Sequence, residues 1–140
     1  MYDTILFPTD GSAGSKRAQE HALALAADQD ATLHVLNVAE VVAPAASLHE
    51  LVAEEMFKYG EKLVHEVATE ATDRGVSVET AVVEGSPAST IASYARTNDI
   101  DAIVMPTHGR PELTKALLGS VTDKVIRTGD IPVIVVKLGD

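Results

Sequence analysis

The stretch of this sequence best suited to chemistry is residues 106–122, PTHGRPELTKALLGSVT. A short apolar run at residues 102–105 precedes it, and the pattern from Ser120 onward predicts the start of a helix. Unpaired backbone N–H groups and the helix dipole favour a bound anion at a helix N-terminus. Gly109 permits a positive φ in the loop, and Gly119 permits a close approach of backbone to a ligand. We therefore predict a phosphate-binding turn.

Charge is unevenly distributed along the chain. The 140 residues include 11 basic and 21 acidic ones, giving a formal net charge of −10. Such a surface repels nucleic acid and anionic membranes, so we expect neither as a partner. The segment 106–128 reverses this balance, because four basic residues stand there against two acidic ones: Arg110, Lys115, Lys124 and Arg127 against Glu112 and Asp123.

Composition indicates an ordinary globular chain, with 46% hydrophobic and 23% charged residues. Its length fits one domain, residues 1–140. The chain has no cysteine, which excludes disulfides, thiol catalysis and cysteine zinc sites and fits a reducing compartment. No apolar run approaches the roughly 20 residues of a membrane span, and the N-terminus does not resemble a signal peptide. We expect a cytoplasmic protein.

Hydrophobic patterns predict five strands separated by helices, with strands at residues 4–8, 31–38, 76–84, 102–105 and 131–136. The second strand is apolar on both faces, which is typical of a parallel sheet covered on both sides. Ser12 or Ser15 can cap the first helix. Ser47 and Glu50 predict a capping box for a long helix that contains Gly60 and ends at Arg74-Gly75. Ser86-Pro87 predicts the start of the next helix.

This alternation predicts an α/β fold with a doubly wound five-stranded parallel sheet, strand order 3-2-1-4-5 and helices on both faces. Ligands of such sheets bind at the carboxyl ends of the strands, where the strand order reverses. That position lies between strands 1 and 4, so Thr9-Asp10 and residues 106–109 should lie side by side. This convergence is the strongest argument from the residues themselves for a binding site.

Several other sites are disfavoured. The sequence lacks G-x-G-x-x-G and G-x-S-x-G, and residues 11–16, GSAGSK, do not have the spacing of a phosphate-binding Walker loop. A phospho-acceptor receiver domain needs clustered carboxylates after strand 1 and an aspartate after strand 3, whereas only Asp10 and Glu84-Gly85 stand there. The histidines show no metal-binding spacing, so we predict no metal site built by protein ligands alone. His34 is expected to be a hydrogen-bonded core histidine.

Five segments carry a family resemblance: ILFPTD (5–10), LHV (33–35), VEGSP (83–87), MPTHGR (105–110) and LLGSV (117–121). Together they resemble the universal stress protein family, whose fold is similar to that of the adenine nucleotide alpha hydrolases, over essentially the whole chain. The family's nucleotide-binding members carry the pattern G-x2-G-x9-G-[ST]. Gly109, Gly119 and Ser120 match its last three positions, whereas Pro106 stands at the first. Proline fixes φ near about −65° and has no N–H, so any contact that needs a free amide there is lost.

The resemblance implies that ATP, or ADP or AMP, binds at the carboxyl ends of strands 1 and 4, with Mg²⁺ arriving on the phosphates. Pro8, Thr9 and Asp10 would face the ribose and the adenine edge, and Val35 would lie against the adenine. The phosphates would be wrapped by two segments: Pro106, Thr107, His108, Gly109 and Arg110, and then Gly119, Ser120, Val121 and Thr122.

Strand 5 is the edge of the predicted sheet and is too apolar to stay bare. The resemblance likewise implies a homodimer across this strand, through Ile131, Val133, Ile134, Val135 and Val136. The first functional hypothesis is a nucleotide-binding stress sensor or switch with slow or no hydrolysis, because no residue is placed as an obvious general base. The alternative is a nucleotide-free dimeric interaction module of the same fold. The third hypothesis is an enzyme that acts on a small phosphorylated metabolite.

Overall fold

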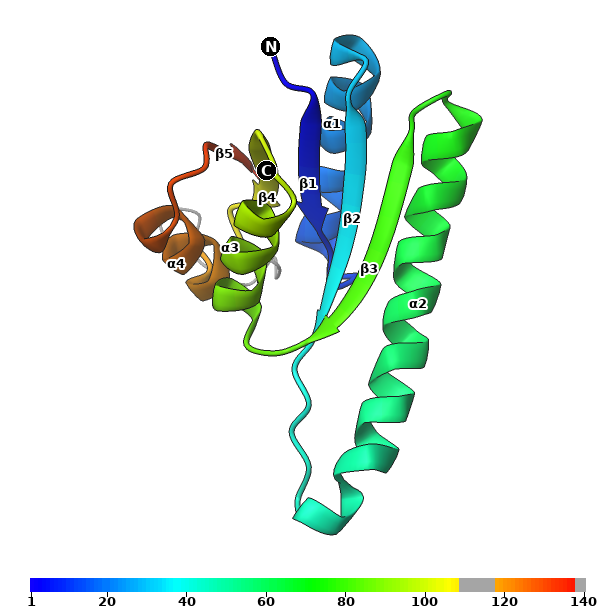
Figure 1. Cartoon of the computed structure of the whole chain (residues 1–140), viewed down its shortest axis with the longest axis vertical. Coiled ribbons are helices and arrows are strands. Elements are labelled where there is room, and N and C mark those ends of the chain that lie inside the picture. Colours follow the sequence, from blue (N-terminus) through cyan, green and yellow to red (C-terminus); the bar gives the residue numbers. More distant parts are fainter. Residues whose placement is uncertain (109–117, 138–140) are drawn as a thin grey trace.

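A computed structural model describes residues 1–108 and 118–137. The elements in chain order are β1 (Thr4–Pro8), α1 (Ala13–Gln29), β2 (Thr32–Ala39), a 3-10 turn η1 (Ala46–Leu48), α2 (His49–Asp73), β3 (Val78–Glu84), α3 (Pro87–Thr97), β4 (Ala102–Pro106), α4 (Ser120–Thr128) and β5 (Val133–Val136). The strands form one parallel sheet in the order β3-β2-β1-β4-β5 (Figure 1). The predicted fold class and strand order are confirmed.

Each face of the sheet is covered by two helices, because side chains that alternate along each strand point to opposite faces. Ile5 and Phe7 of β1 pack in the cluster that includes α1 and α2, whereas Leu6 packs with α3 and α4. Figure 1 shows α1 behind β1 and β2, and α3 in front of β4. Both faces therefore exclude water, and each fully buried large aliphatic side chain contributes about 1.5–3 kcal/mol.

The helix ends predicted from the sequence are found in the structure, with one exception. Ser12 is the N-cap of α1 and accepts a hydrogen bond from the Ser15 N–H (3.2 Å), and Ser86 is the N-cap of α3 with Pro87 behind it. The capping box at Ser47 is wrong, because η1 runs directly into α2 and Leu48 is the N-cap residue. Ser47 therefore lies inside a 3-10 turn and not at the start of the helix. The predicted end of α2 is confirmed by Gly75, which has a φ of +76°.

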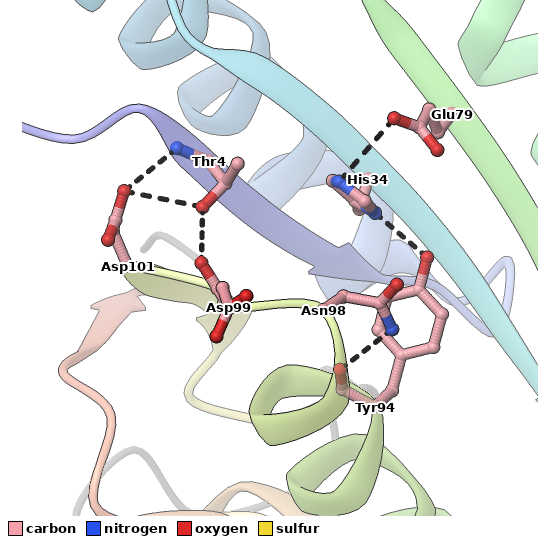
Figure 2. A network of polar contacts seen from close by, with 7 residues as sticks. All are labelled: Thr4, His34, Glu79, Tyr94, Asn98, Asp99 and Asp101. Atoms are coloured by element: carbon pink, nitrogen blue, oxygen red, sulfur yellow. Dashed lines mark hydrogen bonds and ion pairs between the residues drawn. The ribbon is translucent and has the colours of Figure 1, made fainter.

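His34 lies in the polar network between β2, β3 and α3 that Figure 2 shows. The residue is 6% exposed, its Nδ1 lies 2.8 Å from the Tyr94 hydroxyl, and its Nε2 lies 4.0 Å from Oε2 of Glu79. Burial, followed by the Glu79 carboxylate, raises the pKa of Tyr94, so the phenol stays a hydrogen-bonding hydroxyl at neutral pH. The prediction of a hydrogen-bonded core histidine is confirmed.

The same view shows how the amino end of β1 is tied to the start of β4. The Asp101 carboxylate accepts hydrogen bonds from the N–H groups of Asp3 (2.8 Å) and Thr4 (2.9 Å). These bonds lower the pKa of Asp101.

Within residues 1–108 and 118–137, no helix combines the length and the apolar character needed to cross a membrane.

Candidate functional site

A cavity of about 310 Å³ opens at the carboxyl ends of β1 and β4, on the side of the sheet that α3 and α4 cover. One wall is apolar and comes from β1, β2, α3 and β4: Pro8, Leu36, Val38, Pro87, Ile91 and Met105. Polar groups from the ends of β1 and β4 and from two helix N-termini complete the lining. Its size and its mixture of apolar surface with a few polar groups are those of a small-molecule site.

The cavity lies where the strand order reverses. β1 pairs with β4 through Ile5↔Ala102 and Leu6↔Ile103, before either strand reaches its carboxyl end. The chain leaves β1 toward α1 on one face and leaves β4 toward α4 on the other, which opens a crevice at this position in doubly wound sheets. Asp10 and Pro106 therefore line the same cavity although they are far apart in sequence.

The turn after β1 is fixed by hydrogen bonds at both ends. The Thr9 N–H donates to the Leu36 carbonyl (2.8 Å), and the Asn37 side-chain amide donates to the Thr9 carbonyl (2.9 Å). Further on, the Asp10 carboxylate accepts from the Ser12 N–H (2.9 Å) and from the Ser15 hydroxyl (2.8 Å). The resulting loop holds the Asp10 carboxylate at the cavity wall.

The environment of Asp10 keeps it ionised. Burial raises its pKa, but the hydrogen bonds from Ser12 and Ser15 together lower it more, so the pKa lies below the ordinary value. At neutral pH the group is therefore a fixed negative acceptor. It is a poor general base, because a base works best with a pKa near the operating pH.

The N-terminus of α4 forms another part of the cavity lining. Its N-cap is Gly119, and no side chain of the described residues caps it. The Gly119 N–H donates to the Thr107 carbonyl (2.6 Å), and the Thr122 hydroxyl donates to the Pro106 carbonyl (2.9 Å), which ties the helix start to the end of β4. A Cβ at residue 119 would lie 3.2 Å from the His108 Cα. A side chain at residue 119 would therefore require the segment after β4 to move by a few tenths of an ångström.

Most of the predicted binding residues that the structure describes meet in this cavity: Pro8, Thr9, Asp10, Pro106, Ser120, Val121 and Thr122. Gly119 immediately precedes Ser120 in the chain. Thr107, whose carbonyl accepts the Gly119 N–H, is half-buried, and His108 is 3% exposed. The Nδ1 atom of His108 is buried and has no hydrogen-bond partner among the described residues. Gly109 and Arg110 lie outside the described residues.

Val35 is the predicted residue that the structure places elsewhere. Its side chain is fully buried on the face covered by α1 and α2. Because strand side chains alternate, its neighbours in β2 point the other way, and Leu36 and Val38 line the cavity. The apolar wall expected at Val35 is therefore formed by these two residues.

Other lining residues were missed by sequence reasoning, namely Ser12, Ser15, Pro87, Ile91 and Met105. The sequence indicated that Ser12, Ser15 and Pro87 begin helices. A helix that begins at the carboxyl edge of the sheet also contributes its first residues to the cavity lining. For Ile91 and Met105 the sequence indicated only that they are apolar residues of the core. Within the described parts of the chain, no group of three or more metal-ligating side chains occurs.

Lys124 and Arg127 are the two basic residues of segment 106–128 that the structure describes, and neither lines the cavity. Arg127 lies in the last turn of α4 and pairs with Asp123 (2.9 Å), one turn earlier on the same helix. Arg110 and Lys115 lie outside the described residues. The described donors at this wall are therefore backbone N–H groups and hydroxyls of the α4 N-terminus.

The residues predicted for a dimer lie at the other side of β4. β5 ends the sheet order, and its N–H and C=O groups on the outer side face away from β4. Val135 is 36% exposed, Ile131, Val133 and Ile134 are half-buried, and Val136 is buried.

The sequence model described as "Universal stress protein family" matches residues 1–137. Universal stress protein MJ0531 of Methanocaldococcus jannaschii is 37% identical over an alignment 141 residues long that covers 98% of this chain and 83% of that protein. The solved structure of MJ0577, a universal stress protein of the same organism, has a TM-score of 0.88 at 29% identity and covers 98% of this chain and 96% of its own. A universal stress protein in complex with cAMP has a TM-score of 0.70 at 25% identity, over 99% of this chain and 98% of its own.

Proposed function

Because the chain belongs to the universal stress protein family, we propose that it binds an adenine nucleotide at the ends of β1 and β4 and acts as a stress-response sensor or switch. The observation that carries the proposal is the polarity of the cavity. Its lining combines the ionised Asp10, the N-terminus of α4, which no described side chain caps, and an apolar wall. The related protein in complex with cAMP supports this choice of ligand.

Each part of a nucleotide has a matching part of the cavity. The base fits the apolar wall around Leu36, Val38 and Ile91, where burial of aromatic surface is favourable. Asp10 accepts hydrogen bonds from the ribose hydroxyls. The N–H groups at Ser120 and Val121, with the helix dipole, receive the phosphates.

The proposed role is binding rather than fast hydrolysis. Asp10 is the carboxylate that lines the cavity within the described residues, and its lowered pKa makes it a poor base for activating water. Mg²⁺ would arrive on the phosphates, because this ion usually keeps several waters and takes one or two carboxylates. We place the protein in the cytoplasm, in keeping with a chain free of cysteine.

The direct test is to denature the purified protein and identify released nucleotides by chromatography and mass spectrometry. Isothermal titration with ATP, ADP, AMP and cAMP, with and without Mg²⁺, then ranks the ligands. GTP serves as the control for base recognition, since it carries the same phosphates. We expect bound adenine nucleotide and weaker binding of GTP. No co-purified nucleotide and no binding heat at millimolar concentration would overturn the proposal.

The second candidate is a nucleotide-free dimeric interaction module, and Pro106 is the observation that favours it. Pro106 lines the cavity and has no N–H, at the position where the family's nucleotide-binding pattern has glycine. The titration above separates the two candidates, because a module of this kind gives no heat with any nucleotide.

Both candidates include a homodimer across β5. Its outer edge can pair with a second copy, and the exposed Val135 gives that edge an apolar side chain. We expect Val135→Asp to convert dimers to monomers in sedimentation velocity, because the substitution places a charge in the interface. Val42→Asp is the matched control, since Val42 is 77% exposed and lies outside the sheet. A wild-type protein that sediments as a monomer would contradict the dimer.

A further inference from the structure

Asn37 is a buried polar residue in β2 that contacts the proposed site from behind. The residue is 5% exposed. It stands between Leu36 and Val38, which line the cavity, and by strand alternation it points to the opposite face, toward α2. Its amide Nδ2 donates a buried hydrogen bond of 2.9 Å to the carbonyl oxygen of Thr9.

This bond fixes the turn that carries Asp10. The Thr9 N–H already donates to the Leu36 carbonyl (2.8 Å), so both backbone polar groups of Thr9 are held by β2. The following turn closes on itself, through Gly11 N–H to the Thr9 hydroxyl (3.2 Å) and Ser12 N–H to the Asp10 carboxylate (2.9 Å). The direction of the Asp10 carboxylate therefore depends on the orientation of the Thr9 carbonyl.

Gly60 of α2 makes room for this contact. A Cβ at residue 60 would collide with the Asn37 side-chain oxygen and would lie 2.9 Å from Cγ1 of Val82. The preceding residue of α2, Tyr59, covers the turn itself, since a Cβ at Gly11 would lie 2.8 Å from its hydroxyl. A glycine inside a long helix, which the sequence alone leaves unexplained, thus lets α2 pack over both Asn37 and the turn.

We propose that Asn37 is a positioning residue for nucleotide binding, which holds the Thr9 carbonyl from the far face of the sheet and so sets how Asp10 faces the cavity. The inference rests on the proposed nucleotide site. Its chemistry requires an amide, because the Thr9 carbonyl only accepts hydrogen bonds and Asn37 must donate. An ionised carboxylate at residue 37 would face that oxygen with lone pairs, whereas a protonated carboxylic acid could donate again.

Asn37→Asp uses this difference as a test. The dissociation constant for AMP is measured by titration from about pH 5 to about pH 8, as a ratio to wild type at each pH, which cancels the titration of the phosphate. We expect binding about tenfold weaker than wild type at the high end. The ratio should return toward one at the low end, because burial beside a carbonyl raises the pKa of the new carboxyl group and it regains a proton. Asp10 stays ionised throughout this range.

A structural defect alone would not give this result. In an Asp10→Ala background, Asn37→Asp should have little further effect on AMP binding if it acts through Asp10, whereas general loosening would weaken binding by the same factor in both backgrounds. Val67→Ala is the matched control, because Val67 is buried in α2 on the same face and belongs to its hydrophobic cluster. It should lower the melting temperature and leave the AMP dissociation constant unchanged.

Gly60→Ala tests the same contact without changing a polar group, and it serves if Asn37→Asp does not fold. It should weaken AMP binding by crowding the Asn37 amide. The outcomes separate the two proposals. If wild type binds no nucleotide, the proposed function fails and this inference fails with it. If wild type binds AMP and Asn37→Asp and Gly60→Ala bind it equally well at every pH, the inference alone is overturned.

Discussion

The N-termini of α1 and α4 face the same cavity but are built in opposite ways. At α1, the Ser12 hydroxyl accepts the Ser15 N–H (3.2 Å) and the Asp10 carboxylate accepts the Ser12 N–H (2.9 Å). At α4, the N-cap is Gly119, and the side chains of the described residues provide no capping hydrogen bond. Every helix start leaves N–H groups without a partner in the helix. At α1, aspartate and serine satisfy the N–H groups of Ser12 and Ser15, whereas at α4 no side chain of the described residues does the same.

This difference gives the cavity its polarity. The α1 side is rich in acceptors and carries a negative charge, and the α4 side is rich in donors. A ligand with hydroxyl donors at one end and an anion at the other satisfies both sides in one orientation only. Two helix ends of the same kind would bind such a ligand without a preferred direction.

Making α4 resemble α1 is the most damaging change we expect for binding. Ser120→Asp places a carboxylate in the first turn of α4, where it interacts with the N–H groups and repels phosphate. We expect the dissociation constant for AMP to rise about a hundredfold, while the free energy of unfolding rises by about 0.5 kcal/mol, because a negative charge favours a helix N-terminus. Titration calorimetry and thermal denaturation measure the two effects.

Ser120→Asn is the control for this experiment, since it has nearly the same shape without the charge. It should weaken AMP binding much less than the aspartate does. If Ser120→Asp binds AMP as tightly as wild type, the phosphate does not lie at the α4 N-terminus and the comparison of the two helix ends loses its functional meaning.

Removing the charge at the α1 side should have a smaller effect. Asp10→Asn weakens the acceptor for the Ser12 N–H and the ribose, so we expect AMP binding to fall about tenfold and stability at neutral pH to fall by about 1 kcal/mol. Because the folded-state pKa of Asp10 is lowered, its contribution is present above the unfolded pKa of about 3.9 and is lost as pH falls through the folded value. Denaturant unfolding from about pH 6 to about pH 2 should therefore show wild type and variant converging at the acid end.

Asp101→Asn is the matched control for this variant. The pKa of Asp101 is also lowered, by the N–H groups of Asp3 and Thr4 at the opposite end of β1. Its substitution should give the same sign of acid dependence and no change in AMP binding. A loss of AMP binding in Asp101→Asn would show that the effect of Asp10 is general to the fold and not local to the cavity.

The sequence predicts the sheet well because its signals there are local. The strand predicted at residues 4–8 is β1 as observed, and the helix start at Ser86-Pro87 is that of α3. Thr9-Asp10 and Pro106 meet as predicted, because right-handed crossovers and the strand order leave one place for them.

The parts of the site that the sequence does not predict depend on contacts across the chain. β2 is apolar on both faces, so periodicity cannot show that Leu36, rather than Val35, faces the cavity. The hydrogen bond from Asn37 to Thr9 joins two strands, and the fit of Gly60 against Asn37 joins a helix to a strand. No pattern of neighbouring residues indicates either contact, and from the sequence alone Gly60 would only be expected to weaken its helix.

Pro106→Gly should have the smallest effect on AMP binding. It tests whether the hydrogen-bond donors that line the cavity extend from α4 to the end of β4. The N–H groups of Ile103 and Thr107 donate to Pro132 and Val136 on the β5 side. Because N–H direction alternates along a strand, the nitrogen of residue 106 points toward β1, beyond the last β1–β4 pair, Leu6↔Ile103. Proline there costs no hydrogen bond to β5, and glycine would add one donor at the cavity wall.

We therefore expect Pro106→Gly to bind AMP as tightly as wild type or up to about threefold more tightly. The free energy of unfolding should fall by about 1 kcal/mol, because glycine has more conformational freedom in the unfolded chain. Weaker AMP binding would instead mean that the ring of Pro106 contacts the ligand as part of the apolar wall. Tighter binding would extend the donor-rich side from α4 to the end of β4 and sharpen its contrast with the acceptor-rich side at α1.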